Sequence, residues 1–153
     1  MLTHNPELSI HMKRFIHIPK TLVQETTDSV PQEGKRVLEP LKALTASSLV
    51  PLNILENVRT LSEAEIHGSS ADLWHCLSGE ITFTCGGELM EASQKIDSAG
   101  KPIPGEYRGK NIANGEDILL CPGDWLWIPA GVPHQHQSRD VARLVIIKIP
   151  DQP

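Results

Sequence analysis

The sequence predicts an all-β domain, a sandwich or a barrel. Twelve prolines and eleven glycines are spread along the 153 residues, which leaves little room for long helices. Short apolar segments recur along most of the chain, and turn residues separate them at intervals of roughly 8–12 residues, as in sandwiches and barrels. A chain of this length is expected to form one domain that buries a core of its own.

The most strand-like part of the chain begins at Leu49. Leu73–Leu77 and Ile81–Cys85 flank the turn sequence Ser78-Gly79-Glu80, so they predict a hairpin. Further strands are expected at Val50–Arg59, Ile118–Cys121, Trp125–Pro129 and Ala142–Ile149. Residues 92–116 are rich in polar residues, glycine and proline, and predict a long loop, with a hairpin extension as the alternative. Its Tyr107 and Arg108 are candidates for a lid over the barrel.

Residues 1–48 are expected to form an N-terminal extension that packs on a barrel of residues 49–153. A short strand is expected at Arg14–Ile18. Val37–Ala46 has apolar residues at helical spacing, but Pro40 lies in its middle, so extended structure is favoured. We interpret the histidines of this region as solvated or packing residues; they are His4, His11 and His17.

Charge and composition exclude several classes of protein. The net charge is −5 and the basic residues are scattered, so no nucleic-acid partner is expected. No run of 18 apolar residues suggests a membrane span, and the start of the chain lacks a secretory leader. Three cysteines without a C-x-x-C motif predict reduced thiols. We therefore expect a cytoplasmic protein that does not bind membranes.

Two segments carry residues suited to metal binding. Glu65 and His67 are two apart, so they share one face of a strand, and Asp72 follows after the turn Gly68-Ser69-Ser70. His134 and His136 share a face after the rigid turn at 129–133. Imidazoles and carboxylates that converge on one point suit a first-row divalent metal, but spacing alone does not show that the two segments meet.

The second segment resembles the second motif of the cupin family, G-x5-P-x-G-x2-H-x3-N. Gly123, Pro129, Gly131 and His134 match it, and Ser138 stands where the family has Asn. The first segment resembles the first cupin motif, G-x5-H-x-H-x3/4-E-x6-G, less closely. His67 and Gly79 match this motif. Arg59 stands in place of the opening Gly, Glu65 stands in place of the first His, and Asp72 stands in place of the Glu. The resemblance covers residues 49–150.

Similarity to cupins implies a double-stranded β-helix, the closed jelly-roll barrel, with a metal held by Glu65, His67, Asp72 and His134. Two imidazoles and two carboxylates favour Fe²⁺ or Mn²⁺, with Zn²⁺ or Ni²⁺ as alternatives. Because Asp is shorter than Glu, direct and water-mediated ligation by Asp72 both remain open. His136 is a candidate for a fifth ligand, a supporting group or a substrate contact.

Four further side chains are placed by strand parity. His75 faces away from Asp72 and is interpreted as structural or interfacial. Trp74, Trp125 and Trp127 are interpreted as barrel packing, with Trp74 as a pocket wall in the alternative.

The resemblance implies a metal-dependent enzyme, in particular a dioxygenase that acts on a small organic substrate chelating the metal through oxygen. The alternative is a non-catalytic cupin that binds a sugar or small metabolite, with the metal structural or absent. A storage or purely structural role is a third reading. Cupins commonly pair through outer sheet faces, so we expect a homodimer, with Leu144–Ile149 and the N-terminal extension as candidate interfaces.

Overall fold

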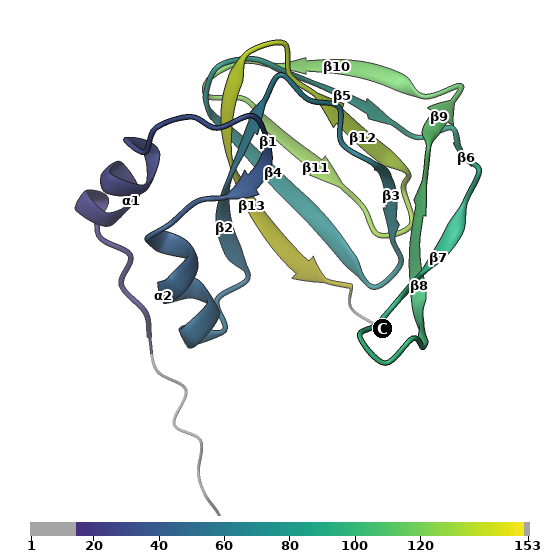
Figure 1. Cartoon of the computed structure of the whole chain (residues 1–153), viewed down its shortest axis with the longest axis horizontal. Coiled ribbons are helices and arrows are strands. Elements are labelled where there is room, and N and C mark those ends of the chain that lie inside the picture. The colour runs from purple at the N-terminus through teal and green to yellow at the C-terminus, as the bar shows by residue number, and fades with distance from the viewer. Residues whose placement is uncertain (1–14, 152–153) are drawn as a thin grey trace, which may run out of the picture.

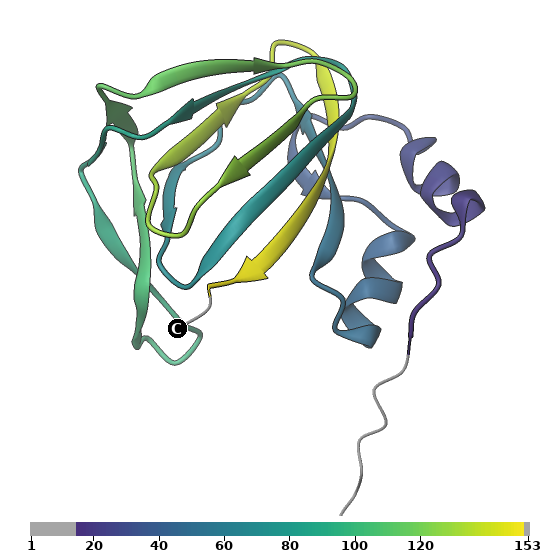
Figure 2. The same ribbon diagram turned by 180° about the vertical axis from the view of Figure 1, so that it is seen from behind.

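The computed structural model describes residues 15–151, which form a β-barrel with two short helices on its outside (Figure 1, Figure 2). The helices are α1 (Lys20–Thr27) and α2 (Leu41–Ser48). The strands are β1 (Gly34–Val37), β2 (Leu52–Val58), β3 (Ala64–His67), β4 (Ser70–Ser78), β5 (Ile81–Cys85), β6 (Glu88–Met90), β7 (Ser93–Ile96), β8 (Pro102–Gly109), β9 (Asn111–Ala113), β10 (Glu116–Leu120), β11 (Trp125–Ile128), β12 (His134–Gln137) and β13 (Val141–Pro150).

Two antiparallel sheets form the walls of the barrel. The five-stranded sheet has the order β1-β2-β13-β4-β11, and the six-stranded sheet has the order β10-β5-β12-β3-β8-β7. A two-stranded sheet of β6 and β9 lies beside them. Sequence neighbours such as β3 and β4, or β4 and β5, belong to different sheets, so the chain crosses repeatedly from wall to wall. This is the jelly-roll architecture that the sequence predicts, and the all-β fold class is confirmed.

Alternation along the strands builds the core between the sheets. On β13 the inward residues Ala142, Leu144 and Ile146 are buried, and their neighbours are only partly covered. Trp74 and Phe83 meet them from the two walls, with ring centroids 5.2 Å apart. Period-2 burial of this kind fixes strand register, because a one-residue slip would turn the apolar set outward.

The prediction that Trp125 and Trp127 pack inside the barrel is wrong. Parity along β11 turns Ile128 inward, and the two indoles outward, where they are 57% and 51% exposed. His75 also faces outward, and its ring stacks on Trp125 at a centroid distance of 4.0 Å. Of the three tryptophans only Trp74 is buried.

The predicted hairpin of residues 73–85 is also wrong, because its two strands lie in different sheets. β4 pairs with β13 and β11, whereas β5 pairs with β10 and β12. The turn between them is a corner. Gly79 has φ of 74° there, and a Cβ on it would lie 2.0 Å from the carbonyl oxygen of Val141. Turn chemistry marks the reversal, but it does not say whether the next strand pairs or crosses.

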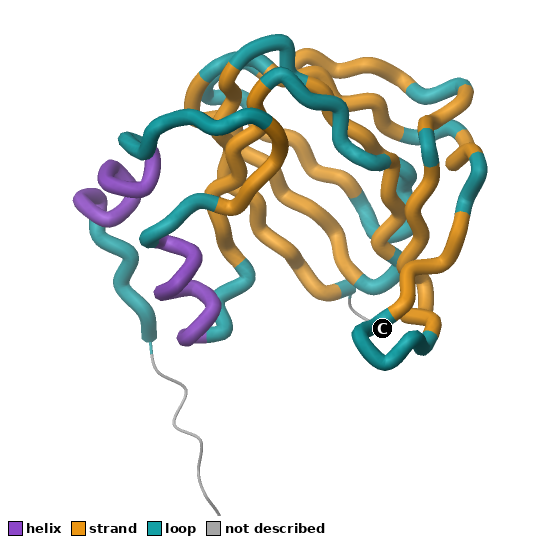
Figure 3. Tube along the Cα trace, in the orientation of Figure 1, coloured by secondary structure: helices purple, strands orange, loops and turns teal. Residues whose placement is uncertain are grey.

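The N-terminal part contains helices that were not predicted. Residues 15–18 form no strand, and α2 replaces the extended structure expected up to Ala46. Pro40 is the N-cap of α2, where a missing N–H is harmless, so it starts the helix instead of interrupting it. Figure 3 shows both helices beside the strands. His17 is exposed, while His4 and His11 lie outside the described residues.

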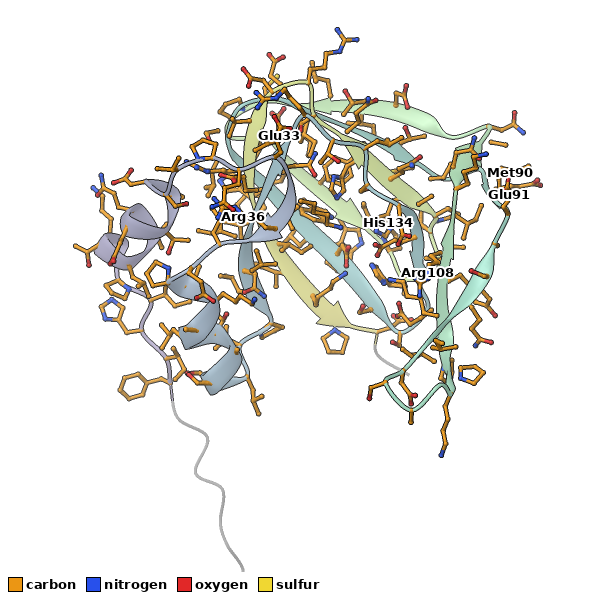
Figure 4. All side chains as sticks on the ribbon, in the orientation of Figure 1. Glu33, Arg36, Met90, Glu91, Arg108 and His134 are labelled. Carbon is orange, nitrogen blue, oxygen red and sulfur yellow. The ribbon has the colours of Figure 1, made fainter. Side chains whose placement is uncertain are left out.

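A buried ion cluster ties this region to the barrel. Glu56 on β2 is fully buried and pairs with Arg36 on β1 at 2.9 Å and with Arg143 on β13 at 2.6 Å. Arg143 also donates to the backbone carbonyls of Thr27, the last residue of α1, and Ser29, just beyond it. The cluster therefore fixes the segment between α1 and β1 against the five-stranded sheet, and Figure 4 shows Arg36 at this junction.

Residues 92–116 are strands and not a loop, in line with the alternative of a hairpin extension. β7 and β8 pair with each other, and β8 continues into the six-stranded sheet by pairing with β3. That pairing sets Glu106 directly opposite His67.

The three cysteines are free thiols in the structure, Cys76 being buried and the other two partly buried. No helix within residues 15–151 has the length and apolar character to cross a membrane.

Candidate metal centre

The strand β3 supplies two inward side chains. Glu65 and His67 both line the barrel cavity, as their spacing predicts, and Glu65 Oε2 lies 3.2 Å from His67 Nε2. β3 is held between β12 and β8, so its inner face is fixed from both sides. Its backbone therefore presents the two donors on the same face, toward the cavity.

The second segment meets the first across a strand pairing. His134 on β12 is the register partner of Glu65, and the ring centroids of His67 and His134 are 5.2 Å apart. Glu65, His67 and His134 each offer one donor atom, and these atoms all lie within 4.8 Å of one another. Figure 4 shows His134 inside the barrel. The two sequence segments thus converge at one point.

Asp72 approaches from the opposite wall. Its Oδ2 lies 3.8 Å from His67 Nε2 and 3.5 Å from His134 Nε2. The side chain is 1% exposed, and Oδ2 is buried without a hydrogen-bond partner. Its other oxygen, Oδ1, accepts a hydrogen bond from Lys148 Nζ at 2.6 Å.

Both imidazoles are oriented so that Nε2 faces this point. His67 Nδ1 lies 2.7 Å from Glu106 Oε2, and His134 Nδ1 lies 3.1 Å from the carbonyl oxygen of Val132. A carboxylate and a carbonyl oxygen accept, so each Nδ1 would carry the proton, and a neutral ring would then present its Nε2 lone pair to a metal. A carboxylate behind a histidine in this way fixes the tautomer and makes a better ligand. Sequence reasoning missed Glu106, because only the pairing of β8 with β3 places it there.

The charges favour ionised carboxylates. Burial alone would raise the pKa of Asp72, but the contacts with His134 and Lys148 outweigh it and lower the pKa. Burial would also raise the pKa of Glu65, but the contacts with His67, Lys35 and Lys95 outweigh it and hold the pKa far below its usual range. At His67 burial opposes protonation, but Glu65 and Glu106 prevail and raise the pKa.

The donor separations fit one small divalent ion. Ligand atoms about 2.1 Å from a shared ion lie roughly 3.0–3.4 Å apart at octahedral or tetrahedral angles. The separations of 3.2, 3.8 and 3.5 Å for Glu65–His67, His67–Asp72 and Asp72–His134 are near this range. The donor atoms of Glu65, His67 and His134 all lie within 4.8 Å of one another, so side-chain movements would bring them onto one ion. The unpartnered Oδ2 of Asp72 supports the same interpretation, because a buried acceptor normally has a partner.

The chain resembles known proteins in structure but not in sequence. No protein-family model matches the chain, and no curated protein sequence matches it. Solved structures do match. The cupin domain of Drosophila melanogaster CENP-C is 13% identical with a TM-score of 0.44, over 67% of this chain and 58% of that one.

Two further structures are similar at the same level. The EutQ protein of Clostridium difficile is 13% identical with a TM-score of 0.43, over 77% of this chain and 62% of that one. A recombinant oxalate oxidase in complex with glycolate is 17% identical with a TM-score of 0.48, over 83% and 55% of the two chains. The chain thus spans less than two thirds of these proteins. The architecture of this chain rests on the two-sheet topology described above.

The two sheets of this chain form a jelly-roll barrel.

The barrel encloses a cavity of about 360 Å³ beside the donor atoms. Trp74 lines it, as the alternative interpretation expects, and so do Val37, Leu55 and Ile146. Tyr107 and Arg108 do not line it, and Arg108 instead pairs with Glu63 at 3.9 Å, so the expected lid is absent from the described residues.

His136 lines the cavity but is not part of the donor group. Its ring packs against Trp74 and Phe83, at centroid distances of 5.6 and 5.2 Å. Burial, helped by the nearby charge of Lys35, lowers its pKa to about 3. His136 is therefore neutral at physiological pH, and its Nδ1 is buried without a partner.

Proposed function

We propose that this cupin barrel binds one divalent metal ion through His67, His134 and Glu65, with Asp72 as a direct or water-bridged fourth ligand. The observation that carries the proposal is Asp72 Oδ2, a buried, unpartnered carboxylate oxygen between two imidazole Nε2 atoms. Lys148 binds Oδ1 of this carboxylate, but a buried oxygen such as Oδ2 that has no donor or cation of its own is unfavourable. Nitrogen and hard oxygen donors together favour Fe²⁺ or Mn²⁺, with Zn²⁺ and Ni²⁺ next.

We further propose that the protein is a metal-dependent enzyme, with a dioxygenase as the first candidate. Two histidines and one carboxylate on one side of an ion leave positions open, and bound Fe²⁺ or Mn²⁺ would supply Lewis acidity or oxygen activation there. Val37, Leu55, Trp74 and Ile146 provide an apolar wall that excludes water from a small organic substrate. Glu106 keeps the His67 ring in the orientation that ligation requires.

The metal content of the purified protein tests the first part. Wild type should contain Fe or Mn at close to one ion per chain, and His67→Ala and His134→Ala should both lose it. His75→Ala is the matched control, because its ring faces outward and stacks on Trp125. Equal metal content in all four proteins would contradict the proposal. Dioxygen uptake by the Fe²⁺-loaded protein with a panel of small oxygen chelators tests the second part.

A second candidate function is a metal-free binding module for a sugar or small metabolite. The lysines favour it, since Lys95 donates to Glu65 at 3.2 Å and Lys148 donates to Asp72, so both carboxylates have cationic partners without a metal. Ligand binding that survives exhaustive chelation would support this candidate.

We also propose a homodimer formed through the outer sheet faces. A monomeric mass at micromolar concentration would contradict it.

A further inference from the structure

The cavity beside the proposed metal offers hydrogen-bond donors in excess of acceptors. Lys35 and Lys148 line it with side chains that remain 38% and 43% exposed. Trp74 adds an indole N–H that is buried without a hydrogen-bond partner. A ligand that pairs with these groups must bring acceptor oxygens, because a buried donor left unpaired is unfavourable.

Most acceptors that line the cavity are already engaged; the exceptions are Asp72 Oδ2, which faces the proposed metal, and a ring nitrogen of the neutral His136. Glu65 Oε2 lies 3.2 Å from both His67 Nε2 and Lys95 Nζ, and Asp72 Oδ1 is bound to Lys148. The Ser62 hydroxyl accepts from the backbone N–H of His136 and donates to a neighbouring carbonyl. The polar side of the cavity therefore suits a ligand that accepts hydrogen bonds, and not one that donates them.

The charges point the same way once a divalent ion is counted. Three lysines from three strands reach the carboxylates: Lys35 from β1, Lys95 from β7 and Lys148 from β13. Together they balance Glu65, Asp72 and the Glu106 carboxylate behind His67, and Arg108 balances Glu63, which also lines the cavity. A bound divalent ion then leaves the centre with about two positive charges in excess, which an anionic ligand would neutralise.

Shape limits the size of this ligand. A cavity of about 360 Å³ holds the volume of roughly twelve water molecules of the liquid. Its apolar wall, made by Val37, Leu55, Trp74 and Ile146, calls for a hydrocarbon or aromatic body.

We propose that the substrate of this site is a small organic carboxylate, whose anionic group lies between the metal and the lysines Lys35 and Lys148 and whose apolar body packs against Trp74. This inference rests on the proposed function, and it adds the class of the substrate. Lys35 and Lys148 are then binding residues in their own right, beyond their pairing with Glu65 and Asp72.

The test compares two probes of the same size and shape that differ in charge, 2-hydroxybenzoate and 2-hydroxybenzamide. Metal loading is measured first, with Mn²⁺ alone, and each probe is then titrated by calorimetry into the Mn²⁺-saturated protein. The carboxylate should bind at least tenfold more tightly than the amide, which is about 1.4 kcal/mol. Lys148→Gln and Lys35→Gln should each weaken binding of the carboxylate by about tenfold and leave binding of the amide within about twofold.

Lys95→Gln is the matched control. It removes the same charge beside the same carboxylate as Lys35→Gln, but Lys95 does not line the cavity. It should therefore keep the preference for the carboxylate. Glutamine can still donate to the buried carboxylates, which protects folding, and retained Mn²⁺ binding verifies that each variant is folded.

The outcomes separate the two proposals. Failure to bind Mn²⁺ contradicts the proposed metal centre itself. Mn²⁺ binding together with equal affinity for the two probes, or with no detectable affinity for the carboxylate, leaves the metal centre standing and overturns the substrate class. The same holds if Lys95→Gln loses the preference as fully as Lys148→Gln does, because the lysines then act only as general neutralising charges.

Discussion

Replacing Glu106 should weaken metal binding although Glu106 is not a ligand. Its Oε2 lies 2.7 Å from His67 Nδ1, and the two side chains are only 16% and 12% exposed, so water replaces the contact poorly. Removing a carboxylate of this kind from behind a metal-binding histidine lowers metal affinity by about 10–100-fold. We expect Glu106→Gln near the lower limit, since its amide oxygen still accepts the hydrogen bond, and Glu106→Ala near the upper limit.

A competition titration of Mn²⁺ against a chromophoric chelator measures this difference directly. Glu91→Gln is the control, because it removes one negative charge from a side chain that is 72% exposed and pairs only with Lys110 at 3.7 Å. Screening makes its effect on the centre small at ordinary ionic strength. If Glu106→Ala binds Mn²⁺ as tightly as Glu91→Gln, Glu106 does not position His67, and the proposed role of β8 is wrong.

Three further predictions concern the backbone, the buried ion cluster and proton competition. Gly68→Ala should lower both Tm and Mn²⁺ affinity, because the added Cβ would lie 2.6 Å from Gly105 Cα and push β8 away from β3. Thermal unfolding measures the change in Tm, and Mn²⁺ titration measures the change in affinity. Glu56→Gln should reduce the free energy of unfolding at pH 7 by about 3 kcal/mol, since it leaves Arg143 without its buried partner. Burial would raise the pKa of Glu56, but its hydrogen bonds outweigh burial and lower the pKa. The stabilisation by Glu56 is therefore present above the unfolded pKa of about 4.3 and is lost as pH falls through the lower folded pKa. Urea unfolding of wild type and Glu56→Gln at several pH values should show the difference in unfolding free energy shrinking in that acidic range. Because the pKa of His67 is raised, protons compete for its ring, and Mn²⁺ affinity should increase from pH 6 to pH 8, by at most about tenfold per unit; a flat titration profile would contradict proton competition.

Local patterns in the sequence predicted most strands but not their partners. The alternation in 142–149 and the turn residues around Gly79 are properties of neighbouring residues, and the strands they indicate are present. Whether β4 pairs with β5 or crosses to the other wall depends on contacts with β13, which is distant in the sequence. The start of α2 was unpredictable for a similar reason. A proline inside a helix breaks it, whereas a proline at its start is tolerated, and the sequence did not show that the helix begins directly after Pro40.

The candidate centre was predictable in part, for a related reason. His67 and His134 stand in motif positions, and Glu65 follows from parity, so the sequence indicates all three. Glu106 and the lysines carry no local signal, because a carboxylate or an ammonium group on a polar strand resembles any solvated residue. Only the pairing of β3 with β8 and the closure of the barrel bring them to the centre.

The donors of the centre come from both walls of the barrel, since Asp72 belongs to the five-stranded sheet and Glu65, His67 and His134 to the six-stranded one. An ion held by all four would act as a cross-link, and the sheets could not separate without releasing it. At a free concentration one hundred times Kd, this linkage adds about 2.7 kcal/mol against unfolding. Metal starvation would then shorten the lifetime of the protein, because proteases attack the opened state, whether or not the centre is turning over substrate.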